Sequence, residues 1–255
     1  MRGYVAFVKK ELMEYARNGK LMILGILFLA FGIMNPAIAK LTPWMLDLLS
    51  EELANSGMAI APVTVDALTS WAQFFKNIPM ALIIFVLMCG SSFTAEYEQE
   101  TLILVLTKGL ARYKVLLAKS TIWTGLWTAG FWLCFLVTYG YNAYFWDNSV
   151  AEGLLPAVTL WWVFGVFTIA VMLLFSVLAR SYGTVLLGMG GVVLASYLLG
   201  LLPKAARFVP TSLMNGYAVL LGAEAGEMLP ALGIALGISA VCVIVSVVVF
   251  HKKQI

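Results

Sequence analysis

Residues 96–119, EYEQETLILVLTKGLARYKVLLAK, form a charged stretch between two long apolar segments of the chain. Three glutamates come first, an apolar run follows at 102–106, and basic residues end the stretch. Both neighbouring segments are apolar enough to cross a membrane. The stretch therefore predicts an amphipathic helix held at the membrane surface between two membrane-spanning helices.

Composition places the whole chain in the membrane class. Of its 255 residues, 62% are hydrophobic and only 11% are charged, with a mean hydropathy of +0.95. Soluble domains usually carry about 25% charged residues, so the chain is predicted to be an integral membrane protein. Cys89, Cys134 and Cys242 all fall in apolar segments, which predicts buried thiols rather than a disulfide framework.

Six segments are long and apolar enough to act as membrane spans, so the sequence predicts an all-α membrane protein with a single transmembrane domain over 1–255. The predicted spans are 21–39, 77–95, 120–146, 153–179, 181–203 and 229–250. Between the first two, residues 40–76 are expected to form short interfacial helices, the first starting at Thr42-Pro43. Residues 203–228, rich in Gly and Pro, predict a partly re-entrant segment.

Residues 1–20 predict an amphipathic helix in the membrane interface. Its apolar positions recur at spacings of three and four, at Val5, Val8, Leu12 and Tyr15. Lys10, Glu14 and Arg17 lie on the opposite side, where Phe7 also falls. Two roles fit this pattern, an elbow helix that contacts a cytosolic partner and an anchor on the lipid surface. Glutamates interrupt the basic run, which argues against nucleic acid as a partner.

The distribution of basic residues predicts the orientation of the chain. If the N-terminus is cytosolic, 12 of the 16 basic residues also lie on the cytosolic side. These are Arg2, Lys9, Lys10, Arg17, Lys20, Lys108, Arg112, Lys114, Lys119, Arg180, Lys252 and Lys253. Lys40, Lys76, Lys204 and Arg207 lie outside. This asymmetry predicts that both termini and the 96–119 loop are cytosolic.

The absence of several sequence motifs disfavours some classes of function. No charged residue lies near the middle of a predicted span, which disfavours a proton-driven transporter but leaves sodium coupling through backbone carbonyls open. The chain lacks a phosphate-binding loop, because Gly19-Lys20 is followed by Leu21. Its single histidine, His251, gives no basis for a metal site or a histidine-based triad. We therefore expect no catalytic residue, metal or cofactor in this chain.

The 96–119 stretch resembles the loop after the second span in ABC type-2 transporter permeases. That family shows E-x-E-x-G-T-L, an apolar run, a short turn, S-R and a later G-K. The matching residues here are Glu96, Glu98, Thr101, Leu102, Lys108, Gly109, Arg112 and Lys119. The chain departs from the pattern at Glu100, Ala111 and Ala118, where the family usually has Gly, Ser and Gly.

The resemblance implies that the chain is the membrane-spanning half of an exporter. Two copies, a homodimer by expectation, would each bind a separate cytosolic ATPase that holds ATP and Mg²⁺, in the plasma membrane of a bacterium. Closure of the ATPases would press on the loop. The contact residues implied are Glu96, Glu98, Glu100, Thr101, Leu102, Lys108 and Arg112. The alternative for these charges is a solvated loop that faces lipid headgroups.

Polar and aromatic residues at similar depth suggest where a substrate could bind. The candidate cavity residues are Asn35, Thr124, Trp127, Thr128 and Trp132. Core packing or a lipid-facing position is the competing interpretation. A cavity without formal charge suits an amphipathic substrate, first a peptide or toxin and otherwise a drug or lipid. A different class stays open, a non-transporting membrane sensor or an assembly scaffold.

Small residues predict where helices approach one another closely in lipid. They are Gly25, Gly32, Gly188, Gly191, Ala195, Gly200, Gly233 and Gly237. The resemblance implies a dimer seam built from the first and fifth spans. For Gly233, which forms a G-x-x-x-G pair with Gly237, packing within the chain is the favoured expectation.

Overall fold

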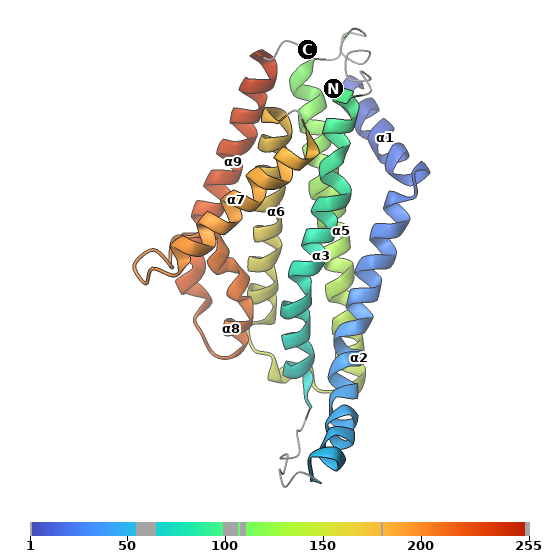
Figure 1. Cartoon of the computed structure of the whole chain (residues 1–255), viewed down its shortest axis with the longest axis vertical. Helices are drawn as coiled ribbons and strands as arrows, with labels where there is room; N and C mark the ends of the chain where they lie inside the picture. The colour runs from blue at the N-terminus through green and yellow to red at the C-terminus, as the bar shows by residue number, and fades with distance from the viewer. Residues whose placement is uncertain (1, 55–64, 99–106, 108–110, 180, 253–255) are drawn as a thin grey trace.

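Seven long helices make up most of the computed structural model (Figure 1), which describes residues 2–54, 65–98, 107, 111–179 and 181–252. They are α1 (Arg2–Arg17), α2 (Lys20–Ala54), α3 (Ala67–Glu98), α5 (Arg112–Phe145), α6 (Leu154–Leu178), α7 (Tyr182–Gly200) and α9 (Leu229–Lys252). The shorter elements are η1 (Asn148–Val150), η2 (Pro210–Asn215), α8 (Gly216–Leu220) and η3 (Ala225–Met228). No strand occurs in these ranges. The all-α prediction is confirmed.

Six of the helices are long and apolar enough to cross a membrane, as the sequence predicted. They are α2, α3, α5, α6, α7 and α9, with η3 extending the last of them. An even number of spans returns the chain to its starting side, and both termini lie at the same end of the bundle (Figure 1). We call this the terminal end. The protein is thus a multi-pass membrane protein.

α2 is longer than the predicted span 21–39, because it continues without a break from Lys20 to Ala54. Both Pro36 and Pro43 lie inside it, so the Thr42-Pro43 pair does not start a new helix. Proline removes the donor that would bond the carbonyl four residues earlier. At Pro36 that carbonyl belongs to Gly32, and it accepts a hydrogen bond from the Thr138 hydroxyl of α5 at 3.0 Å. A neighbouring helix thus compensates for the proline.

Two other helices also begin at residues that differ from the predicted ones. α3 begins at Ala67 rather than at 77, and α5 begins at Arg112 rather than at 120. The early turns of α3 bury Trp71 and Phe74, which supplies the packing that a local pattern does not show. α6, α7 and α9 match the predicted spans to within three residues at each end.

An aromatic cluster fills the space between α2, α3 and α5. The Trp127 ring lies 5.9 Å from Phe28 of α2, 5.6 Å from Phe85 of α3 and 5.3 Å from Phe131 of its own helix, measured between ring centroids. These side chains are fully buried. Large aromatic contacts of this kind dominate core energetics, so the three helices form one packed unit.

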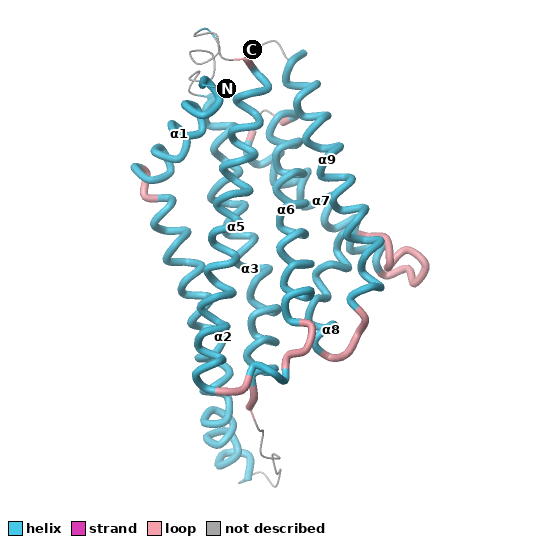
Figure 2. The backbone as a smooth tube through the Cα atoms, turned by 180° about the vertical axis from the view of Figure 1, so that it is seen from behind, coloured by secondary structure: helices cyan, strands magenta, loops and turns pink. Residues whose placement is uncertain are grey.

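α6 is the most buried of the six spans and lies at the centre of the bundle (Figures 1 and 2). It is apolar on all sides, as expected for a helix surrounded by others. The neighbouring helices can approach α6 closely because glycines leave room for the rings that face them. A Cβ at Gly165 of α6 would lie 2.2 Å from the Trp127 ring, and a Cβ at Gly188 of α7 would lie 2.2 Å from Phe175 of α6.

α7 runs obliquely along the outside of the bundle, and the loop that follows it protrudes from the side (Figures 1 and 2). The chain then returns through η2 and α8 to α9. This segment packs against α6, because Leu213 is fully buried and the Met214 carbonyl accepts a hydrogen bond from the Trp161 indole at 2.7 Å. Whether the segment re-enters the membrane stays a prediction.

Replacing Gly165 with alanine should destabilise the bundle, because the new methyl group would overlap the buried Trp127 ring. Overpacking of this kind costs about 1–3 kcal/mol. Gly125→Ala is the matched control, since a Cβ at Gly125 has no atom within 4 Å. Thermal unfolding in detergent micelles should show a lower midpoint for Gly165→Ala alone. Equal midpoints for the two variants would contradict the packing described here.

Candidate functional site: a buried charge cluster at the terminal end

α1 lies against the bundle by a face that the sequence pattern did not predict. Phe7, Glu11 and Tyr15 are buried, whereas Val5 and Leu12 are exposed. Exposure of Val5 and Leu12 is compatible with the apolar face expected of an interfacial helix, but Phe7 and Glu11 are buried although the apolar pattern did not include them. The reason is polar pairing across helices, because α1 turns its acidic side toward partners that its local periodicity cannot reveal.

Lys119 of α5 is the most deeply buried charged side chain among the residues described, with no exposed surface. Its ammonium nitrogen lies 3.1 Å from Oε2 of Glu11 on α1 and 3.0 Å from Oε2 of Glu96 on α3. It also donates to the Ser92 hydroxyl at 3.4 Å. A charge this deeply buried persists because carboxylates neutralise it. One side chain thereby joins three helices.

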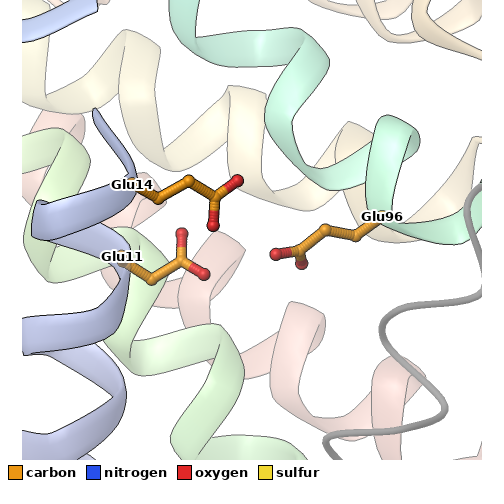
Figure 3. A group of neighbouring side chains, drawn as sticks. All are labelled: Glu11, Glu14 and Glu96. Carbon is orange, nitrogen blue, oxygen red and sulfur yellow. The ribbon is translucent and has the colours of Figure 1, made fainter. Parts of the chain in front are cut away.

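Lys10 completes the arrangement from the solvent side. Its ammonium nitrogen lies 3.1 Å from Glu11, 2.9 Å from Glu14 and 3.3 Å from Glu96. Figure 3 shows the three carboxylates pointing toward one another, two from α1 and one from α3. We call Lys10, Glu11, Glu14, Glu96 and Lys119 the charge cluster.

The three carboxylates could in principle hold a metal ion, because one oxygen from each lies within 4.8 Å of the others. Oxygen ligands suit hard cations such as Ca²⁺ or Mg²⁺. However, the Lys10 ammonium already contacts all three carboxylates at 2.9–3.3 Å. A lysine cation thus occupies the centre of this group, and the cluster is an ion-pair network rather than a metal centre.

Burial and charge oppose each other at Glu11. Burial alone would raise the pKa of its carboxyl group, but the ammonium groups of Lys119 and Lys10 lower that pKa below its ordinary value of 4.5. At Lys10, burial would lower the pKa, whereas Glu14, Glu11 and Glu96 raise it above its ordinary value. Both groups are therefore charged at neutral pH.

Uncharged hydrogen bonds also fasten α1 to α5. The Trp123 indole donates to the Tyr15 hydroxyl at 3.0 Å, and the Tyr4 and Thr121 hydroxyls lie 2.7 Å apart. Burial raises the pKa of Tyr15, so this phenol stays neutral. Interhelical polar contacts of this kind hold helices together where lipid removes the hydrophobic driving force.

Of the residues expected to contact an ATPase, Glu96 and Arg112 are described in full, and both have partners within the chain. Glu96 belongs to the charge cluster. The Arg112 guanidinium donates to the Phe250 and His251 carbonyls at 3.3 and 3.4 Å, and so caps the C-terminal end of α9. The side chain of Glu98 and residues Glu100, Thr101, Leu102 and Lys108 lie outside the described part of the structure.

The five candidate cavity residues have different surroundings in the described part of the structure. Asn35 is buried, and its side-chain amide donates to the Thr138 hydroxyl at 3.2 Å. The Asn77 side-chain amide donates to Oδ1 of Asn35 at 3.0 Å. Trp127 lies in the aromatic cluster described above, and Trp132 packs against Phe131 and Phe135. Thr124 and Thr128 line an open groove of about 550 Å³ along α5.

An apolar cavity of about 300 Å³ between α3, α6 and α7 was missed by the sequence analysis. Pro79, Trp161, Met189 and Gly190 are among its lining residues, and none of its lining residues is charged. Thr168 is its one polar side chain, and its hydroxyl donates to the Phe164 carbonyl at 2.9 Å. Its apolar residues resemble those of any packed helix face, so the sequence carried no signal for it.

The predicted small-residue contacts divide into two groups. A Cβ at Gly32 would lie 2.9 Å from Val137, and one at Gly200 would lie 3.3 Å from Val209, so these glycines, like Gly188, pack within the chain. Ala195 is exposed. Positions with no atom within 4 Å are Gly25, Gly191, Gly233 and Gly237. The expectation that Gly233 packs within the chain was wrong, because its helix face is open.

Comparison with protein-family models and with curated proteins finds no match for this chain.

Replacing Lys119 with methionine should lower the free energy of unfolding by about 3–5 kcal/mol, because Glu11 and Glu96 would keep buried charges without their shared partner. Lys114→Met, on the same helix but only partly buried, should change it by less than about 0.5 kcal/mol. Denaturant titration in micelles provides the measurement. A second change, Glu11→Gln, should restore part of the loss by removing one of the two buried carboxylates that then share Lys10 alone.

Acid should also weaken the attachment of α1. Because the folded-state pKa of Glu11 lies below its ordinary value of 4.5, its contribution to stability is present above about that pH and is lost as the pH falls through the folded-state pKa. Thermal unfolding measured from neutral pH downward should therefore show a steeper decline in the native chain than in Glu11→Gln. Identical pH profiles would exclude this role for Glu11.

Proposed function

We propose that the chain is the membrane-spanning permease subunit of an ABC-type exporter, which couples ATP hydrolysis by a separate ATPase to outward movement of an amphipathic substrate. The proposal draws on the resemblance of residues 96–119 to the coupling loop of ABC type-2 permeases. One observation carries it. Glu96 and Lys119, on either side of the segment between α3 and α5, form an ion pair of 3.0 Å.

This ion pair gives the segment a mechanical connection to the bundle. A force on residues 99–111 acts on α3 and α5 together, because their ends are tied to one another through Glu96 and Lys119. The force also reaches α1, since Glu11 shares the same lysine. A partner ATPase that binds ATP and Mg²⁺ would thereby move three helices as one body, in a chain that carries no phosphate-binding loop.

The apolar cavity between α3, α6 and α7 supports an amphipathic substrate. It has no charged lining residue and no unpaired hydroxyl, so it suits the apolar part of a molecule better than an ion. A peptide or toxin is our first choice of substrate, with a drug or lipid as the alternatives. The open face at Gly233 and Gly237 offers a surface for another helix, in keeping with a dimer in the bacterial plasma membrane.

The first experiment is purification of the tagged chain from its native membrane in mild detergent, followed by identification of what accompanies it. A nucleotide-binding subunit at one copy per chain supports the exporter. If the chain is recovered without any such subunit, and cells that lack it show no change in exported compounds, a sensor or scaffold role replaces the proposal.

Reversing the charge of Glu98 and Glu100 to lysine should separate ATP hydrolysis from transport, since Glu100 lies in the segment proposed to receive the force and Glu98 is the last residue of α3 before it. The complex reconstituted in vesicles should hydrolyse ATP at a rate that no longer responds to substrate, and substrate accumulation should fall at least tenfold. Glu224→Lys with Glu227→Lys is the matched control, because these exposed glutamates lie at the N-cap and in the first turn of η3, at the end of the last span opposite the predicted cytosolic side. Unchanged coupling in the Glu98 and Glu100 variant would count against the docking role.

A further inference from the structure

α1 separates its charges between two faces. The carboxylates of Glu11 and Glu14 point into the charge cluster, where Lys10 and Lys119 neutralise them (Figure 3). Lys9 lies on the other side and Arg17 in the last turn, and both are exposed and without a carboxylate partner among the described residues. The sequence mixes acids and bases along this helix, but in the folded chain the charged groups left without an ion-pair partner on α1 are basic.

The outward face of α1 also carries exposed apolar side chains. Val5 and Met13 are 62% and 50% exposed, and Leu12 is exposed beside them. Val5, Lys9, Met13 and Arg17 follow one another at intervals of four residues, so they form a single row on the helix surface. Apolar and basic side chains therefore alternate along the row, a composition typical of helices that lie in the headgroup region of a membrane.

The connection to α2 determines how deep this row of side chains lies relative to the membrane. α1 ends at Arg17, and the first membrane span starts at Lys20 after a turn in which Gly19 has a φ of 70°. Arg17 is thus three residues from the start of a membrane-spanning helix. At that level the groups available to an exposed guanidinium are lipid headgroups, while the neighbouring apolar side chains reach the acyl boundary.

We propose that the outward face of α1, the row formed by Val5, Lys9, Met13 and Arg17, is a binding surface for anionic phospholipid headgroups. The occupant follows from charge complementarity, because Lys9 and Arg17 are exposed without a carboxylate partner among the described residues, whereas the partly exposed carboxylate of Glu14 is paired with Lys10 at 2.9 Å. The charge cluster makes this possible, since it buries Glu11 and neutralises Glu14. The inference does not depend on the proposed transport function.

The test measures which lipids lie next to α1 in the full-length chain. Met13→Cys provides a single labelling site, because Cys89, Cys134 and Cys242 are buried. The labelled protein is reconstituted in vesicles of phosphatidylcholine and phosphatidylglycerol, and a fluorophore at position 13 is quenched by nitroxide carried on either lipid. The ratio of the two quenching efficiencies reports the local enrichment of anionic lipid.

Phosphatidylglycerol should be enriched at α1, and Lys9→Gln with Arg17→Gln should remove most of that enrichment, by up to about fivefold for each charge. Lys204→Gln with Arg207→Gln is the matched control, since these exposed cations lie in the loop after α7. High salt should lower the ratio in the native chain without any substitution, which keeps the test decisive if the double variant fails to fold. A ratio of one in the native chain, or one unchanged by the α1 substitutions or by salt, would overturn the proposal, and the latter outcome would point to a protein partner on this face.

Discussion

The placement of Lys119 between two carboxylates is the constraint on which the terminal end depends. An ammonium group without exposed surface is stable there only because Glu11 and Glu96 reach it from different helices. Each carboxylate in turn needs the lysine. The position of α1 against the bundle and the spacing of α3 and α5 are therefore set by one shared requirement for charge balance, reinforced by the hydrogen bonds of Tyr15 and Tyr4.

Away from this end, packing rather than charge holds the helices together. Trp127 occupies the space between α2, α3 and α6 because Gly165 leaves room for its ring. In the same way, Gly188 of α7 leaves room for the Phe175 ring of α6. A bundle joined by charge at one end and by aromatic packing through its length could transmit movement of its terminal end into the membrane while the aromatic cluster stays intact.

The sequence was sufficient to predict the class and the number of spans, because apolar runs of this length have few alternatives in a chain with so little charge. It was less informative about boundaries. Thr42 and Pro43 indicated a new helix, yet α2 continued, since helix packing can compensate for a proline. The charge cluster was missed for a related reason. Glu11, Glu96 and Lys119 are far apart in sequence, and Glu96 and Lys119 were expected in a cytosolic loop.

The bond between Thr138 and the Gly32 carbonyl has a consequence for how this chain could vary through evolution. Pro36 creates the need for that bond, and Thr138 meets it from another helix. Serine at position 138 would preserve the hydrogen-bond donor. Valine, which is similar in shape, would leave the Gly32 carbonyl without this donor. Two positions that are 102 residues apart are thus expected to vary together, with loss of the proline removing one of the two hydrogen bonds that constrain Thr138, the other being the bond it accepts from Asn35.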